Sequence, residues 1–182
     1  MKFTKLHGCG NGYIYVNLFE ERIDNPVEMA IKVSDHHFGI GSDGLITIGP
    51  SSVADFAMCI YNADGSEAEM CGNGIRCVGK YVYDHGLTDK TSITVESKAG
   101  IKYLTLNVEN GKVATVCVDM GEPIFEPSKI PVVAEGEMVV DEPIQVGDKV
   151  WNMTCVSMGN PHAVIFLDTP DRKSTRLNSS HP

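Results

Sequence analysis

The stretch NADGSEAEMCGNGIRC, residues 62–77, predicts a helix that begins directly after a glycine-rich loop. From Ile75 to Val82 the apolar residues recur at helical spacing. Gly86 follows at the place where a glycine commonly ends a helix. Cys71 therefore lies in the loop at the N-terminus of this helix, which is the most informative local prediction for the chain.

Cys71 is the strongest candidate for a catalytic residue. A thiol at a helix N-terminus lies near the positive end of the helix dipole and near unpaired backbone N–H groups, which favour its thiolate form. Gly72 and Gly74 allow the backbone to curl around an anion, so a substrate carboxylate could bind to the same N–H groups. The alternative is an inert core cysteine, which is our interpretation of Cys59, Cys77, Cys117 and Cys155.

The six cysteines are interpreted as reduced thiols. They lie in apolar patterns or beside glycines, and the N-terminus lacks the apolar segment of a signal peptide. No cysteine or histidine spacing typical of zinc sites occurs, so no metal is expected. No apolar run approaches the roughly 18 residues of a membrane-spanning helix, so we expect no membrane contact and a cytoplasmic location.

The charge of the chain argues against a nucleic-acid partner. The net charge is −9, whereas binding to phosphates needs a basic surface. Residues 172–182 depart from the acidic pattern, because they hold three basic side chains and no acidic one in a Ser/Asn/Thr-rich segment. We interpret this segment as a non-native tail.

Short strand patterns fill most of the remaining chain. In the first part they cover residues 13–19, 45–48, 55–61, 92–97, 101–108 and 113–119. Asn110-Gly111 joins the last two in a hairpin, and Asn25 is the expected N-cap of a further helix. Many short strands with few helices are typical of antiparallel barrels or sandwiches.

Three prolines between residues 121 and 131 predict a domain boundary. We expect a first domain over residues 1–120, part of a second over 121–171, and the tail over 172–182. In the second part the strand patterns cover residues 144–146, 150–153, 155–158 and 163–167. The last two flank a loop that contains Asn160 and His162.

Residues 39–44 match the pattern Gly-x-Gly-x-x-Gly of dinucleotide-binding proteins but lack its context. That fingerprint follows a strand and opens a helix, whereas here a helix is predicted before it and a strand after it. We therefore expect turns or a close backbone approach at these glycines, and no nucleotide site.

Three polar residues have two open interpretations each. Asn11 in a glycine-rich turn and Asn62 at the end of a strand are either turn-forming residues or functional ones. His162 is either an acid–base group near a site or a solvated loop histidine.

On these motifs the chain resembles the diaminopimelate epimerase family. Residues 62–77 are the most specific match, and Gly10-Asn11, residues 39–46 and residues 156–162 match in the same order, so the resemblance covers residues 1 to about 171. It implies an α+β fold of two pseudo-symmetric, antiparallel β-barrel-like domains, each around a central helix, with the site in the cleft between them. The second domain is expected to be incomplete here.

The resemblance also implies a reaction. Members of the family interconvert LL- and meso-diaminopimelate in lysine and peptidoglycan biosynthesis without pyridoxal phosphate or metal, so no cofactor is expected. One cysteine, as thiolate, removes the α-proton, and a second cysteine on the opposite face returns one from its thiol. Diaminopimelate is the expected partner, and the full-length enzyme is expected to be a homodimer.

Carried over residue by residue, the resemblance makes Cys71 the first acid–base cysteine. Gly72 and Asn73 would offer backbone N–H groups to the α-carboxylate, and His162 would lie close to the reacting centre. Three asparagines would hold the polar ends of the substrate, namely Asn11, Asn62 and Asn160.

The chain departs from the family pattern at three points. Gly12 replaces the acid that usually follows Asn11, and Gly44 stands where some members use glutamine to contact the substrate. The second cysteine, in a Cys-Gly-Thr-Gly-like turn, has no match, so we expect the 182-residue chain to be inactive as an epimerase.

Three other function classes stay open at this stage. The chain could be a non-catalytic carboxylate-binding fragment in which Cys71 is incidental, or a cysteine-nucleophile hydrolase with His162 as its base. It could also be a related amino-acid racemase of the proline racemase type. Those enzymes typically carry histidine at the position of Asn73, which favours the diaminopimelate epimerase family.

Overall fold

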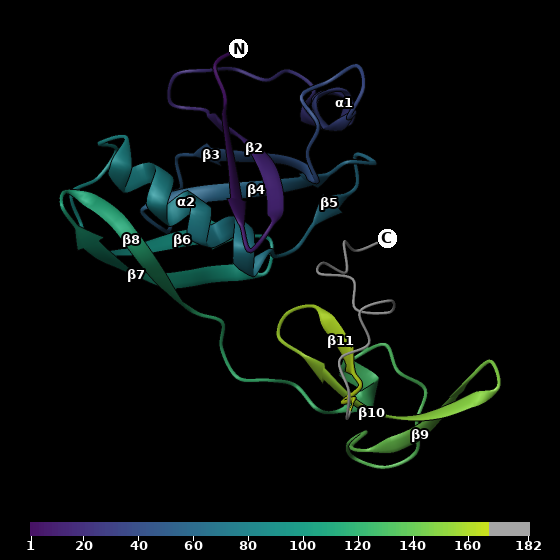
Figure 1. Cartoon of the computed structure of the whole chain (residues 1–182). Coiled ribbons are helices and arrows are strands. Elements are labelled where there is room, and N and C mark those ends of the chain that lie inside the picture. Colours follow the sequence, from purple (N-terminus) through teal and green to yellow (C-terminus); the bar gives the residue numbers. More distant parts are fainter. Residues whose placement is uncertain (168–182) are drawn as a thin grey trace. The chain divides into compact units, whose positions relative to one another are not determined.

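The computed structural model describes residues 1–167 of the 182-residue chain (Figure 1). The chain forms two compact units, one over Met1–Asp119 and one that begins at Met120. Each unit has its own sheet and its own core. The segment that we interpreted as a non-native tail, residues 172–182, lies outside the described residues.

The first unit is built on one mixed sheet with the strand order β1-β2-β3-β4-β6-β7-β8, in which the short β5 pairs with β4. The strands are β1 (Thr4–Gly8), β2 (Asn11–Asn17), β3 (Gly44–Gly49), β4 (Phe56–Asn62), β5 (Glu67–Ala68), β6 (Ser92–Ser97), β7 (Gly100–Glu109) and β8 (Lys112–Asp119). The pairs β2–β3 and β4–β6 are parallel, and the other pairs are antiparallel.

Each parallel pair is explained by the helix between its strands. Helix α1 (Pro26–Ser34) joins β2 to β3, and helix α2 (Gly72–Asp84) lies between β4 and β6. Parallel neighbours need a long crossover connection, and a helix commonly supplies it. The strand pattern alone predicts antiparallel pairing. That expectation holds for most pairs of the sheet, and the pairs β2–β3 and β4–β6 depart from it.

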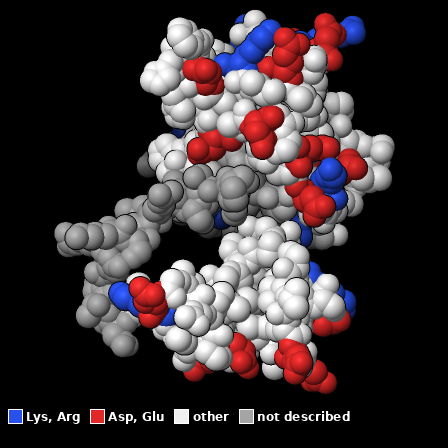
Figure 2. All heavy atoms as spheres, turned by 90° about the vertical axis from the view of Figure 1, so that its right-hand side faces the viewer, with Lys and Arg blue, Asp and Glu red and all other residues white. Residues whose placement is uncertain are grey.

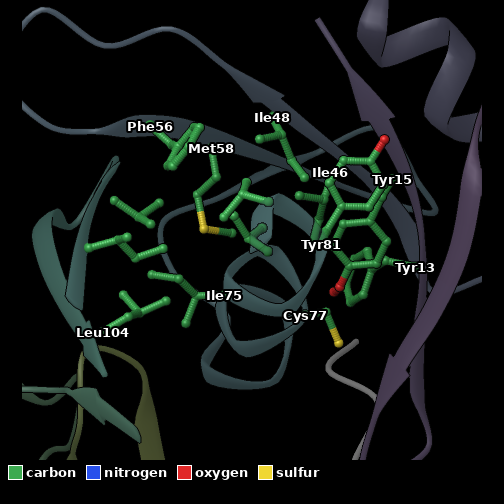
Figure 3. Packing of buried hydrophobic residues seen from close by; sticks show 14 of the residues in the cluster. Tyr13, Tyr15, Ile46, Ile48, Phe56, Met58, Ile75, Cys77, Tyr81 and Leu104 are labelled. Carbon is green, nitrogen blue, oxygen red and sulfur yellow. The ribbon is translucent and has the colours of Figure 1, made fainter. Parts of the chain in front are cut away.

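Helix α2 is enclosed by the curved sheet (Figure 1) and contacts β1, β2, β7 and β8. Its predicted apolar stripe is confirmed, because Ile75, Val78 and Val82 are fully buried. These side chains belong to the main core, together with residues of the sheet such as Ile46 and Leu104 (Figure 3). The central helix of the expected fold is therefore present in the first unit.

Helix α1 covers the other face of the sheet beside β2 and β3. Its Asn25 cap is confirmed, because the Asn25 side chain accepts the Glu28 N–H at 3.1 Å. Ala30 and Val33 pack in a second cluster with residues of β2 and β3. Strand β2 is therefore buried on both faces.

Two predicted turns have the expected backbone geometry. Asn110 and Gly111 adopt φ values of 51° and 75°, as the hairpin between β7 and β8 requires. At the end of α2, the His85 N–H donates to the Tyr81 carbonyl at 3.0 Å, and Gly86 follows with φ 72°. The helix thus ends where the sequence predicts.

The described part of the second unit holds a three-stranded sheet with the order β11-β10-β9 and a short 3₁₀ helix. The elements are η1 (Pro127–Lys129), β9 (Glu142–Val146), β10 (Lys149–Ser157) and β11 (Pro161–Val164). Ile130, Val139 and Cys155 form its small core. Up to residue 167 this unit contains no α-helix.

Two expectations for the second unit are corrected. The strands predicted over residues 150–153 and 155–158 are one continuous strand, β10, because no turn residue separates them. His162 lies in strand β11 rather than in a loop, and it pairs with Val156 of β10.

The six cysteines are free thiols, but two of the four that we interpreted as core cysteines are exposed. Cys77 and Cys155 are buried as predicted, whereas Cys59 and Cys117 are exposed. Successive side chains in a strand point to opposite faces. Cys59 lies between the buried Met58 and Ile60, so it faces away from the core.

The face seen in Figure 2 carries scattered acidic and basic side chains and no broad basic area. Neither of the helices in residues 1–167 is long and apolar enough to span a membrane.

We predict that Ile75→Ala lowers the free energy of unfolding by about 2–5 kcal/mol, because it leaves a cavity between α2 and the sheet. The matched control is Val53→Ala at a 61% exposed position, where we expect a change within about 0.5 kcal/mol. Urea denaturation of the two variants measures both values. Equal losses would contradict the central role of α2 in the core.

Candidate functional site

Cys71 is the N-cap residue of α2, as its predicted place before the helix implies. Its Sγ accepts the Gly74 N–H at 3.2 Å, and its carbonyl accepts the Ile75 N–H at 2.9 Å. Cys71 as a whole residue is half-buried. Gly72 and Asn73 form the first turn, whose N–H groups precede the intrahelical hydrogen bonds.

Asn11 meets Cys71 from strand β2. The distance from the Cys71 Sγ to the Asn11 Oδ1 is 3.5 Å, although the two residues are 60 positions apart. The structure therefore brings together two predicted site residues of the first unit that are far apart in sequence. In this geometry the thiol donates its proton to the amide oxygen.

Asp43 fixes the orientation of Asn11, and the sequence analysis missed it. Its Oδ2 accepts the Asn11 Nδ2 at 3.3 Å and the Gly12 N–H at 2.7 Å. With its amide nitrogen held by the carboxylate, Asn11 turns its oxygen toward Cys71. The signal was available, because Asp43 lies inside the glycine-rich residues 39–44, where only the glycines had been considered.

Asn73 is held by its neighbours in the first turn of α2. The Arg76 guanidinium hydrogen-bonds to the Asn73 Oδ1 and lies 3.9 Å from the Cys9 Sγ. Gly8 packs closely against Asn73. A Cβ added to Gly8 would lie 3.0 Å from the Asn73 carbonyl oxygen. The side-chain oxygen of Asn73 is thus occupied within the protein, and its backbone N–H belongs to the first turn of α2, where such groups can bind an anion.

Asn62 lies at the end of β4 and takes part in a tight turn. Its Nδ2 donates to the Ser66 Oγ at 3.0 Å, and its N–H donates to the Ser66 carbonyl at 2.8 Å. It is also the register partner of Gly44, so it lies beside the residues that orient Asn11. These contacts agree with the turn-forming interpretation, and a substrate contact would have to compete with Ser66.

Gly44 has no room for a side chain. A Cβ built on it would lie 2.2 Å from the Tyr61 carbonyl oxygen and 2.8 Å from the Tyr13 Cε1. The glutamine that some family members carry there has no counterpart in this site.

Two tyrosines of β2 reach the start of α2, and neither was singled out from the sequence. Tyr13 and Tyr15 lie on the side of β2 that faces α2, close to Cys77 (Figure 3). The Tyr15 hydroxyl donates to the Gly74 carbonyl at 3.4 Å. Burial, more than any nearby charge, raises the pKa of both phenols above the usual range, so both stay protonated.

Cys77 differs from Cys71 in its surroundings. It is buried in the same helix, and burial raises the pKa of its thiol despite a hydrogen bond from Tyr15 and the charge of Arg76, which act in the opposite direction. Cys77 therefore stays a neutral thiol in the core, as expected.

Asn160 and His162 are neighbours within the second unit. The Asn160 Oδ1 lies 3.1 Å from the His162 Nε2, and the backbone turns between β10 and β11 at Gly159 with φ 97°. His162 is exposed and Asn160 is half-buried. Within this unit the two side chains form one polar pair.

No cluster of three or more metal-ligating side chains occurs in residues 1–167. The groups that hydrogen-bond to the Cys71 sulfur in the first unit are a backbone N–H and an amide oxygen. The N–H groups at the start of α2 can bind an anion.

Solved structures of other proteins share the fold of this chain. A hydroxyproline epimerase from Agrobacterium vitis matches with a TM-score of 0.65 at 15% identity, over 90% of this chain and 50% of its own. A PhzF-family phenazine biosynthesis protein from Bacillus anthracis matches with a TM-score of 0.61 at 20% identity, over 91% of this chain and 56% of its own. The fold is therefore that of the proline racemase and PhzF proteins, as expected.

Sequence comparison narrows this class. The sequence model of the family named "Diaminopimelate epimerase" matches residues 3–126, and the chain belongs to this family. A diaminopimelate epimerase from Agathobacter rectalis is 71% identical over 92% of this chain and 61% of its own length. A diaminopimelate epimerase from Methanococcus maripaludis is 60% identical over 94% of this chain and 62% of its own length. The chain thus spans about three-fifths of the length of these curated relatives.

We predict that Gly44→Ala destabilises the first unit by about 1–3 kcal/mol or more, because the new Cβ collides with backbone and with the Tyr13 ring. Gly12→Ala is the control, since its Cβ would meet only the His7 Cβ at 3.9 Å. Urea denaturation compares the two variants. A loss for Gly12→Ala as large as that for Gly44→Ala would refute this steric explanation.

Proposed function

We propose that this chain is the part of a diaminopimelate epimerase that carries the first of two acid–base cysteines. The observation that carries the proposal is the position of Cys71, a half-buried residue whose sulfur caps α2 and accepts the Gly74 N–H at 3.2 Å. Membership of the family and the high identity to curated diaminopimelate epimerases support it.

In the proposed reaction, the Cys71 thiolate removes the α-proton of diaminopimelate, and the proton forms the thiol on Sγ. The C–H electron pair stays on the α-carbon and delocalises into the α-carboxylate. The N–H groups of Gly72 and Asn73, at the positive end of α2, stabilise this added charge. A second thiol on the opposite face then donates a proton to the α-carbon, which inverts the centre.

The remaining predicted site residues take supporting roles in this proposal. Asn11, Asn62 and Asn160 bind the polar ends of the substrate, and His162 supports the reacting centre. For Asn62 this requires release from Ser66, and for Asn160 and His162 it requires release from each other. A cytoplasmic location and a homodimer of the full-length enzyme complete the proposal.

The described contacts of Cys71 disfavour a cysteine hydrolase. A hydrolase needs a base such as histidine hydrogen-bonded to the nucleophile. In residues 1–167 the hydrogen-bond partners of the Cys71 sulfur are the Asn11 amide oxygen and the Gly74 N–H. Neither group is a base that could activate a hydrolytic nucleophile.

We predict that Cys71→Ala lowers epimerisation by at least about 100-fold, because the base is lost. The test protein is a chimera of residues 1–167 with the remaining C-terminal part of the Agathobacter rectalis relative. Chiral chromatography measures the conversion of LL- to meso-diaminopimelate. Cys59→Ala, at an exposed position on β4, is the control and should keep full activity. Epimerisation by the Cys71→Ala chimera would exclude the proposed base.

We also predict that the 182-residue chain alone does not invert diaminopimelate, because a base on one face returns the proton to that face. Incubation in D₂O, with mass spectrometry and chiral chromatography, separates exchange from inversion. Deuterium incorporation with inversion by the purified chain would show that one cysteine-bearing unit is sufficient.

A further inference from the structure

Asp43 holds together three segments of the first unit: the start of β2, the start of β3 and the turn after β4. Its N–H donates to the Gly12 carbonyl at 2.7 Å, and its carbonyl accepts the Ala63 N–H at 3.1 Å. Its Oδ2 accepts the Gly12 N–H at 2.7 Å and the Asn11 Nδ2 at 3.3 Å. These hydrogen bonds leave the carboxylate little freedom to move.

The residues on either side of Asp43 are fixed as well. Ser42 is buried, and its Oγ donates to the Gly44 carbonyl at 3.0 Å. Gly44 lies so close to the next strand that a Cβ added to it would be 2.2 Å from the Tyr61 carbonyl oxygen. The backbone that carries the Asp43 carboxylate is therefore held on both sides.

The Asp43 carboxylate determines which end of the Asn11 amide faces Cys71. An ionised carboxylate only accepts hydrogen bonds, whereas an asparagine side chain has a donor end and an acceptor end. With its Nδ2 on Asp43, Asn11 places its Oδ1 3.5 Å from the Cys71 Sγ. The reverse orientation would set the Asn11 oxygen against the carboxylate, where two acceptors repel each other.

The groups beside Cys71 therefore have two opposite polarities. Gly72 and Asn73 lie in the first turn of α2, and their N–H groups suit a carboxylate. Asn11 presents an oxygen, which suits an ammonium group and repels a carboxylate. An α-amino acid carries an ammonium group and a carboxylate on one carbon, so it matches both sides.

We propose that Asp43 is a positioning residue that determines substrate specificity at Cys71: it commits the Asn11 amide to present its oxygen, which accepts the ammonium group of the substrate. The substrate carboxylate then takes the N–H groups at the start of α2. This role rests on the proposed function, in which Asn11 binds a polar end of the substrate, and it names that end.

The first test measures how Cys71 discriminates between reagents of opposite charge. In the 182-residue chain, iodoacetate brings a carboxylate to the sulfur, and 2-bromoethylammonium brings an ammonium group. Mass spectrometry of the Cys71 peptide gives both alkylation rates at one pH. Their ratio is independent of the thiolate fraction, because both reagents attack the thiolate. The exposed Cys59 in the same sample corrects for the intrinsic reactivity of the reagents.

Asp43→Ala should shift the corrected ratio toward iodoacetate by about fivefold, the effect of one ordinary hydrogen bond, because Asn11 can then turn its amide nitrogen toward the sulfur. The matched control is Asp84→Ala. It removes another half-buried carboxylate that accepts a backbone N–H, that of Val113 at 2.8 Å, at the opposite end of α2. The control should keep the ratio of the unmodified chain, and equal ratios in the two variants would overturn the proposal.

A double-mutant cycle with Asn11→Ala separates the orientation of the amide from the charge of Asp43. Loss of a negative charge favours an anionic reagent by itself, and this contribution persists when the Asn11 amide is absent. We expect the shift caused by Asp43→Ala to be at least about threefold smaller in the Asn11→Ala chain. A shift of the same size in both chains would mean that charge alone acts, which contradicts the proposal.

Asp43→Ser replaces Asp43→Ala where circular dichroism shows that the alanine variant does not fold. A serine hydroxyl can still accept the Gly12 N–H, as serine commonly does in turns. Because a hydroxyl donates as well as accepts, it permits both orientations of the Asn11 amide. The ratio should again move toward iodoacetate, and an unchanged ratio would refute the role of Asp43.

The alkylation ratio needs neither substrate nor a second cysteine. An inactive chimera would therefore count against the proposed function and leave the preference for an ammonium group at Asn11 to be decided by this ratio. In an active chimera, Asp43→Ala should raise KM for diaminopimelate by about fivefold, more than it lowers kcat. A KM equal to that of the unmodified chimera would exclude Asp43 from substrate recognition.

Discussion

The first unit depends on how helix α2 begins. Its N-cap is a sulfur that accepts the Gly74 N–H, where an oxygen of serine, threonine, aspartate or asparagine is usual. Sulfur is a weak acceptor, so the helix start relies on the buried Ile75 and Val78 for its position. The cap and the proposed base are therefore the same atom, and a change in the protonation of Cys71 also changes the hydrogen bond that begins the helix.

Strand β2 connects this helix start to the rest of the fold. Because its side chains alternate, Tyr13 and Tyr15 face α2, whereas Ile14 and Val16 pack with residues of α1. The same alternation places Asn11, at the start of the strand, on the side of Cys71. Burial on both faces allows little movement of β2, so the groups around the sulfur are held by the core rather than by a loop.

Local patterns in the sequence predicted the parts of the fold that depend on near neighbours. The cap at Asn25, the stripe from Ile75 to Val82 and the turn at Asn110-Gly111 each follow from residues a few positions apart. The parallel pairs and the outward face of Cys59 depend on strand order, which no local pattern contains. Asp43 was missed for the same reason, since its partner Asn11 is 32 residues away.

Gly44 and Tyr13 show why a motif shared with a family predicts the fold better than it predicts the role of a single residue. They are register partners on β2 and β3, and the space between them holds only one side chain. A long side chain on β3 would displace the ring, and the ring excludes a side chain on β3. In this chain the space beside Gly44 is taken by the Tyr61 backbone and the Tyr13 ring, so no side chain on β3 can enter it.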